Sequence, residues 1–261
     1  MRLRLYQVDA FSSQVFSGNP AAVVPLDAWL PDHLLQAIAS ENNLAETAFV
    51  MRDELRGWQI RWFTPVQEVD LCGHATLASA WILFNRLATG LEQVRFGSRS
   101  GPLVVTQQEG EWMEMDFPSR PPEPCPLPEG LVEALGATPR ETLLSRDLVA
   151  VFDSEELVRG LTPDMSKLAA LDLFAVVATA RGDEADFVSR FFAPRVGVPE
   201  DPVTGSAHCS LVPYWAARLN KKQLLAHQVS ARGGILQCED RGERVGLSGQ
   251  AVLYLEGHIT V

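Results

Sequence analysis

Alternating apolar and polar positions predict many short strands and few helices. Residues 3–11 alternate in this way and read as a strand. Further strands are expected at 21–24, 44–50, 58–63, 94–96, 103–107, 112–116, 148–152, 174–179 and 187–192. After Pro31, apolar side chains recur at helical spacing and predict an amphipathic helix over 31–40, and a shorter helix is expected over 163–170. This mixture predicts an α+β protein made mostly of sheet.

One buried helix is predicted in each part of the chain. Residues 75–84 are apolar on nearly every side, which is typical of a helix enclosed by other elements. The stretch 63–86, which contains this helix, is loosely repeated at 192–218: Phe-Thr-Pro matches Phe-Ala-Pro, and Gly-His-Ala matches Gly-Ser-Ala. The segment 230–236 then echoes 98–103, which extends the similarity beyond the helix. The repeat predicts a duplicated fold in which each half places several strands around one helix.

A composition break separates the two halves. Residues 118–130 hold six prolines in thirteen positions, which excludes a helix interior or a central strand and indicates a semi-rigid linker. We therefore expect an N-terminal half over 1–117, with its central helix from about 73, and a C-terminal half over 131–261, with its central helix from about 205. The last strand could pack on the first half. A ligand-binding cleft is expected between the halves.

Composition and charge limit the kinds of molecule that the protein is expected to bind. The chain has 261 residues and a formal net charge of −11, which argues against binding to nucleic acid or to an anionic membrane. No apolar run approaches the ~20 residues that span a bilayer, and the start resembles neither a signal nor a transit peptide. The four cysteines at 72, 125, 209 and 238 are irregularly spaced. Free thiols and a cytoplasmic location are therefore expected.

The two predicted helix starts are candidate anion sites. Gly73 and Gly205 stand at matching positions where each buried helix begins. A helix N-terminus offers unpaired backbone N–H groups and a partial positive charge. Two such ends facing each other would hold one small anionic molecule. The alternative is that both glycines only permit tight turns.

Five side chains near these helix starts could carry chemistry, and each has a structural alternative. Glu46 has small apolar neighbours and could exchange a proton, or it is a surface residue at a strand edge. His74 could take part in catalysis, cap the helix or lie in the core. Asp201 and Ser206 are equally explained as helix caps. Cys72 could be a thiolate activated by the helix start, or an inert buried thiol.

Neither a metal nor a cofactor is predicted. Cys72-x-His74 and His208-Cys209 have no recognised zinc-ligand spacing. The chain also lacks a phosphate-binding loop, a dinucleotide fingerprint and a serine-elbow motif.

Four motifs give the chain a specific resemblance. GNPAAVV at 18–24, NLAETAF at 43–49, FTPVQEVDLCGHAT at 63–76 and EDPVTGSA at 200–207 together resemble the PhzF family of phenazine biosynthesis-like isomerases. The resemblance covers nearly the whole chain. It implies a diaminopimelate epimerase-like fold of two pseudo-symmetric halves, each a rolled, mostly antiparallel sheet around a central helix. It also implies a cofactor-free homodimer that moves a proton within a small carboxylate-bearing substrate.

The resemblance assigns roles to the candidate residues. Glu46 matches the acid/base that shuttles the proton, and His74 and Asp201 match residues that assist it. The residues implied in substrate binding are Asn19, Cys72, Gly73, Gly205 and Ser206. The chain departs from phenazine-pathway members at 70–72 and at Ala75, which border the expected pocket. The substrate is therefore not specified by the resemblance.

Two other functions stay open. Cys72-Gly73-His74 also resembles the first cysteine motif of proline racemases, but Thr204 occupies the position of their second thiol. This disfavours a two-cysteine racemase and leaves a single-cysteine racemase or dehydratase of a proline-like substrate as the alternative enzyme. A non-catalytic protein that binds a small acid is the third possibility.

Overall fold

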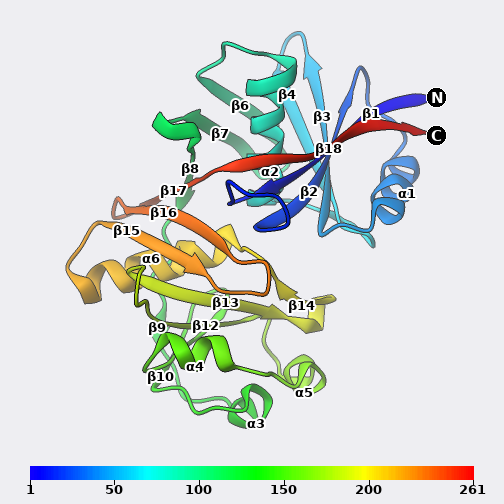
Figure 1. The fold of residues 1–261 in the computed structure, drawn as a ribbon. Helices are drawn as coiled ribbons and strands as arrows, with labels where there is room; N and C mark the ends of the chain where they lie inside the picture. The colour runs from blue at the N-terminus through cyan, green and yellow to red at the C-terminus, as the bar shows by residue number, and fades with distance from the viewer. The chain divides into compact units, whose positions relative to one another are not determined.

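The computed structural model describes residues 1–261, which form two compact units (Figure 1). Unit 1 comprises Met1–Asp116 together with Ser248–Val261, and unit 2 comprises Phe117–Leu247. The chain leaves unit 1 within β8 (Met113–Pro118) and returns within β17 (Arg244–Gly249). None of the helices combines the length and apolar character that crossing a membrane requires.

Unit 1 contains β1 (Arg2–Ala10), β2 (Asn19–Leu26), α1 (Asp32–Asn42), β3 (Glu46–Asp53), β4 (Gly57–Phe63), β5 (Glu68–Val69), α2 (Gly73–Ile82), β6 (Gln93–Ser98), β7 (Gly101–Gln107) and β18 (Ala251–Thr260). Most neighbouring strands are antiparallel, and only the β2–β3 and β4–β6 pairs are parallel. At the end of the chain, the last strand packs on the first half. β18 pairs with β1 along nearly its whole length, so residues 248–261 belong to unit 1.

α2 is the buried helix predicted from its apolar sequence. It packs against β1, β2, β3 and β18, and nearly all its side chains are buried. Its two hydroxyl side chains are satisfied inside the helix. Thr76 Oγ1 donates to the Cys72 carbonyl at 2.6 Å, and Ser79 Oγ donates to the Ala75 carbonyl at 2.7 Å. Buried polar groups without such partners would destabilise the core. The helix ends in a π-helical turn, η1 (Leu83–Leu87).

Unit 2 contains β9 (Glu123–Pro124), α3 (Leu131–Leu135), β10 (Glu141–Leu144), β11 (Leu148–Val151), α4 (Glu155–Gly160), α5 (Met165–Ala170), β12 (Val176–Arg181), β13 (Phe187–Ala193), η3 (Pro194–Val196), β14 (Val198–Asp201), α6 (Gly205–Leu219), β15 (Gln223–Gln228) and β16 (Gly234–Asp240). Its strands repeat the connectivity of unit 1. β10–β11 and β12–β13 are antiparallel pairs joined by a parallel β11–β12 contact, and β13 pairs in parallel with β15 across α6.

The repeat extends to the hairpins after the buried helices. The segments 98–103 and 230–236, which resemble each other in sequence, contain the turns between β6 and β7 and between β15 and β16. In each turn a serine hydroxyl accepts a backbone N–H: Ser98 from Ser100 at 3.2 Å, and Ser230 from Gly233 at 3.1 Å. The predicted α+β fold, with mostly antiparallel strands and one buried helix in each part, is confirmed.

The proline-rich segment 118–130 is built into unit 2 instead of standing apart as a linker. β9 pairs with β10, and the Arg120 N–H donates to the Cys209 carbonyl at 2.9 Å. That carbonyl lies in α6, four residues before Pro213. Because proline has no N–H, it cannot supply the usual helical hydrogen bond to this carbonyl. Arg120 therefore satisfies a group that the helix itself leaves open.

Candidate active site

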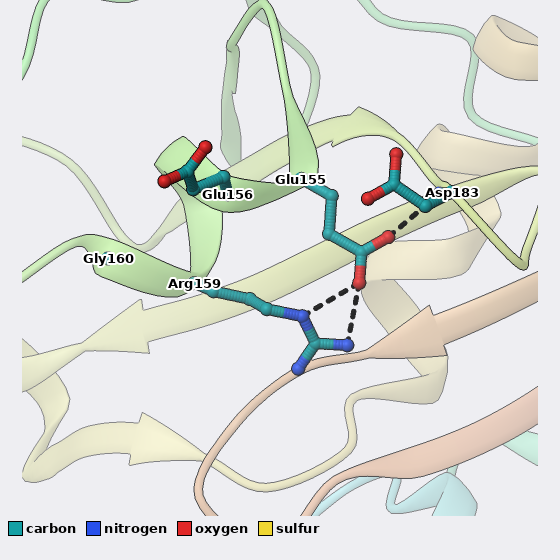
Figure 2. Close-up of a pocket in the computed structure, with 5 residues that line it drawn as sticks. All are labelled: Glu155, Glu156, Arg159, Gly160 and Asp183. Carbon is teal, nitrogen blue, oxygen red and sulfur yellow. Dashed lines mark hydrogen bonds and ion pairs between the residues drawn. The ribbon is translucent and has the colours of Figure 1, made fainter.

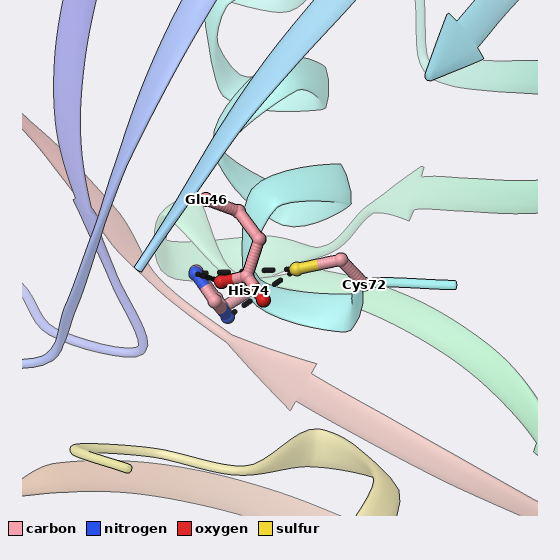
Figure 3. Close-up of side chains that lie close together, drawn as sticks. All are labelled: Glu46, Cys72 and His74. Carbon is pink, nitrogen blue, oxygen red and sulfur yellow. Dashed lines mark hydrogen bonds and ion pairs between the residues drawn. The ribbon is translucent and has the colours of Figure 1, made fainter. Parts of the chain in front are cut away.

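Three side chains from separate positions in the sequence meet in unit 1 (Figure 3). Glu46 is the first residue of β3, Cys72 immediately precedes α2, and His74 is the second residue of α2. Glu46 Oε2 lies 3.1 Å from His74 Nε2. Cys72 Sγ lies 3.5 Å from His74 Nδ1 and 4.0 Å from Nε2. The histidine ring therefore contacts both a carboxylate and a thiol.

The packing of α2 on two parallel strands creates this cluster. β2 and β3 run in the same direction, so their first residues lie at one edge of the sheet, with Ala21 opposite Glu46. Asn19, the buried first residue of β2, places its Nδ2 3.2 Å from His74 Nδ1. Since α2 packs on both strands, its first turn reaches this edge. The motifs around Asn19, Glu46 and His74 thus converge.

The cluster favours a protonated histidine beside a carboxylate. Burial alone lowers the pKa of His74, but Cys72 and Glu46 raise it well above its usual range. Burial and the Glu46 charge raise the pKa of Cys72 to about 11. Asn19 can hydrogen-bond to His74 Nδ1 whether or not that nitrogen is protonated. A half-turn of the side-chain amide presents its carbonyl oxygen as an acceptor in place of its NH₂ donor.

Both buried helices begin without a side-chain cap. Neither Cys72, which precedes α2, nor Thr204, which precedes α6, accepts a hydrogen bond from the first turn with its side chain. The Thr204 hydroxyl donates to Asp201 Oδ2 instead. The N-cap position of α6 is thus occupied by Thr204 and not by Asp201 or Ser206. At each helix start, the residue that precedes the helix leaves the first-turn N–H groups without the usual side-chain cap.

The unit 2 candidates surround the start of α6. Asp201 ends β14, and Gly205 and Ser206 are the first two residues of α6. Arg146 Nη2 lies 3.4 Å from Ser206 Oγ, while the same guanidinium stacks 4.7 Å from the centre of the Phe174 ring. These residues belong to unit 2, whereas Asn19, Glu46, Cys72 and His74 belong to unit 1.

Gln228 organises the loop before α6, a role that the sequence did not reveal. Its side chain is fully buried at the end of β15. Its Oε1 accepts the Thr204 N–H at 2.8 Å, and its Nε2 donates to the Asp201 carbonyl at 2.8 Å. Gln228 belongs to none of the four recognised motifs, and its partners lie on a distant loop. The only sign of this role is that a polar side chain occupies a position among buried neighbours.

Replacing Gln228 should destabilise unit 2. Gln228→Met keeps the approximate shape but leaves the buried Thr204 N–H without its acceptor. An unsatisfied buried group costs about 1–3 kcal/mol, so the free energy of unfolding in urea should fall by about that amount. Gln223→Met, at the exposed start of the same strand, is the matched control and should change stability little. Equal effects of the two substitutions would contradict the assigned role.

His208 is a core residue, and its titration should weaken the fold in acid. Its Nδ1–H donates to the Thr204 carbonyl at 2.8 Å, and burial lowers its pKa to about 4. The ring is neutral when folded, whereas an unfolded histidine has a pKa of about 6.5. Its contribution is therefore complete above about pH 6.5 and is lost as the pH falls toward 4, about 3 kcal/mol in all.

The test compares unfolding free energies at pH 7.5 and pH 4.5. His208→Asn can still donate to the Thr204 carbonyl but does not titrate, so it should lose less stability than the wild type between these values. His258→Asn, at an exposed position of β18, should retain the wild-type pH dependence. An unchanged pH dependence in His208→Asn would contradict the prediction.

A hollow of about 430 Å³ lies elsewhere, on unit 2 (Figure 2). Its lining residues are Glu155, Glu156, Arg159, Gly160 and Asp183. The Glu155 carboxylate accepts from Arg159 Nε at 2.7 Å and from the Asp183 N–H at 2.9 Å. The second contact ties α4 to the turn between β12 and β13. The hollow contains none of the candidate site residues, and we assign it no catalytic role.

Comparison with known proteins places the chain in a family. The sequence model of the phenazine biosynthesis-like proteins matches residues 8–257. The chain belongs to the phenazine biosynthesis-like family. It is 55% identical to an uncharacterised isomerase of Pseudomonas aeruginosa over 98% of both chains. It is also 38% identical to phenazine biosynthesis-like domain-containing protein 1 of Mus musculus over the full length of both.

Solved structures agree with this membership. The crystal structure of a PhzF family protein from Enterococcus faecalis is 50% identical, covers all of both chains and gives a TM-score of 0.97. A hydroxyproline epimerase from Agrobacterium vitis, at 11% identity and a TM-score of 0.63, shares the fold alone. The phenazine biosynthesis-like family places the chain among isomerase-type enzymes with an epimerase-like fold.

Proposed function

We propose that this member of the family is a cofactor-independent isomerase that moves a proton within a small carboxylate-bearing substrate. Glu46 is the acid/base, and the observation that carries this role is its ion pair with His74. The Glu46 side chain retains 19% of its exposure, whereas the His74 side chain retains 7%. The carboxylate is therefore accessible to a substrate, while the more deeply buried His74 contacts it.

The proposed reaction needs no electron acceptor. The Glu46 carboxylate removes a proton from a substrate carbon, and the electron pair of that C–H bond forms a new carbon–carbon double bond. The former double bond opens, and its electron pair takes the same proton back from Glu46 at a second carbon. The His74 ring contacts this carboxylate, with Nε2 3.1 Å from Glu46 Oε2.

The helix starts supply the proposed binding groups for the substrate carboxylate. α2 begins beside Glu46 and has no side-chain cap, so its first N–H groups can receive an anion. In unit 2, Gly205 and Ser206 offer the same arrangement at α6, with Asp201 and Arg146 nearby. We propose that Asn19 and Cys72 line the unit 1 part of the site. The cleft between the two parts and the homodimer remain predictions from the sequence.

Thiolate chemistry is the second candidate function. It is favoured by the 3.5 Å contact between Cys72 Sγ and His74 Nδ1, since a histidine can accept a thiol proton. Against it, burial raises the pKa of Cys72 to about 11, and Thr204 donates its hydroxyl hydrogen to Asp201. A thiol of this kind would be protonated at neutral pH. We therefore rank acid/base catalysis by Glu46 first.

Solvent-deuterium incorporation provides the test. Small cyclic and amino-acid carboxylates are incubated with the protein in deuterated water and followed by mass spectrometry. A substrate of the proposed isomerase should change structure and carry deuterium at the carbon that receives the proton. Binding without exchange or conversion would instead identify a non-catalytic acid-binding protein. Exchange only at the original carbon, together with inversion, would favour the racemase.

A further inference from the structure

We propose that Glu46, Cys72 and His74 also form a three-ligand site for Zn²⁺, and that the ion competes with substrate for the active site. The competition rests on the proposed function, whereas the metal site rests on geometry alone. One carboxylate oxygen, one thiol sulfur and one ring nitrogen all lie within 4.8 Å of one another. Carboxylate, thiolate and imidazole are the three side-chain types that bind zinc in proteins.

The distances nearly match a tetrahedral zinc site. Zinc bonds of about 2.0–2.1 Å to nitrogen and oxygen and about 2.3 Å to sulfur place tetrahedral ligand atoms about 3.3 Å (N to O) and 3.6 Å (N to S) apart. The observed separations are 3.1 Å from Glu46 Oε2 to His74 Nε2 and 4.0 Å from Cys72 Sγ to the same nitrogen. These two separations need shifts of only a few tenths of an ångström, and the third, from the Glu46 carboxylate oxygen to Cys72 Sγ, lies within 4.8 Å.

The surroundings support Nε2 as the ligand atom of His74. The other ring nitrogen, Nδ1, is already engaged 3.2 Å from the buried Asn19 amide. Histidines bound to a metal usually donate their second ring N–H to a nearby oxygen, which fixes the orientation of the ring. The Asn19 carbonyl oxygen can take this place after a half-turn of the amide. Asn19 is therefore the orienting partner that a zinc-bound His74 requires.

Three protein ligands leave one position of a tetrahedral ion open. Two of the ligands, Cys72 and His74, are buried, and the partly exposed Glu46 gives the ion its route from solvent. On binding, a zinc–sulfur bond forms as the S–H bond of Cys72 breaks, and a zinc–nitrogen bond forms as the Nε2–H bond of the protonated His74 ring breaks. Both protons pass to the buffer. Glu46 and His74 then hold the ion. The carboxylate that accepts a substrate proton in the proposed reaction is thereby occupied.

Cobalt titration provides the test on the intact protein. Co²⁺ takes the place of Zn²⁺ and gives an absorption band from thiolate-to-cobalt charge transfer only when sulfur is bound. We expect one Co²⁺ per chain with this band, displaced by one equivalent of Zn²⁺. Cys72→Ser should lose the band, whereas Cys125→Ser, which removes the only cysteine that is not buried, should keep it.

Two further variants separate the site from adventitious binding. Glu46→Gln should weaken Zn²⁺ binding, measured by competition with a chromogenic chelator, because an amide is a poor zinc ligand. Asn19→Ala should weaken it about 10–100-fold, as expected for loss of an orienting partner. Wild-type protein without the charge-transfer band, or Cys72→Ser with wild-type affinity, would overturn the metal site.

Activity measurements then test the competition. Zn²⁺ should inhibit proton transfer in the wild type, and raising the substrate concentration should relieve the inhibition. Persistence of full activity at saturating Zn²⁺ would overturn the competition. If instead no substrate is ever turned over, the proposed function fails while the cobalt spectrum still decides the metal site. The two failures are therefore distinguishable.

Discussion

Glu46→Gln should lower the rate of proton transfer by about 10²–10⁴-fold, the usual contribution of general acid–base catalysis. Glutamine keeps the size of the side chain and can still contact His74, but it cannot accept a proton from carbon. Substrate binding should survive, since the first turn of α2 is unchanged. The measurement is deuterium incorporation under single-turnover conditions, with the substrate Kd determined separately.

Two further variants are measured for comparison with Glu46→Gln. Glu41→Gln makes the same chemical change at an exposed position of α1 and should leave the rate unchanged. Cys72→Ser should cause a much smaller loss than Glu46→Gln, because a neutral thiol that lines the site is replaced by a hydroxyl of similar shape. An active Glu46→Gln beside an inactive Cys72→Ser would reverse the assignment in favour of thiolate chemistry.

Gly18→Ala should destabilise the protein by about 2–5 kcal/mol, combining a left-handed backbone cost with overpacking. Gly18 has φ +69°, and a Cβ added there would lie 2.2 Å from the Ala10 carbonyl oxygen. That oxygen belongs to the backbone of β1 and cannot move without distorting the strand. Because Asn19 is the next residue, the same change should displace the partner of His74 and reduce activity.

Gly57→Ala is the matched control for this prediction. Gly57 has a similar φ of +73°, but a Cβ there would meet no atom within 4 Å. Only the backbone cost of about 1–2 kcal/mol should appear, with no effect on the active site. Urea unfolding of both variants, together with their deuterium-incorporation rates, measures the difference. Equal losses of stability would show that the contact with Ala10 is not what restricts Gly18.

Local pattern was sufficient for the elements around the site. The continuous apolar run over 75–84 can be satisfied only by burial on every side, and α2 is buried accordingly. The matched stretches at 63–86 and 192–218 produced matched connectivity, because equal patterns of strand, turn and helix fold under the same constraints. The residues proposed as catalytic therefore lie in motifs that can be recognised without knowledge of their neighbours in space.

Long-range packing determines contacts that the sequence motifs cannot predict. Cys72 and His74 lack a zinc-ligand spacing, and the third ligand atom comes from Glu46 on a separate strand that joins them only when α2 packs on β2 and β3. The pairing of β18 with β1, which moved residues 248–261 into unit 1, depends on hydrogen bonds between opposite ends of the chain.

Periodicity and turn chemistry act over a few neighbouring residues, so the strand-rich fold and the two buried helices follow from local pattern, and the candidate residues follow from short motifs. Which side chains touch depends on tertiary packing. Three contacts each join residues from different elements: the Glu46–His74 ion pair, the Asn19–His74 contact and the hydrogen bond from the Thr204 N–H to Gln228. Such contacts are set by the packing of whole elements, and a local pattern contains no information about that packing.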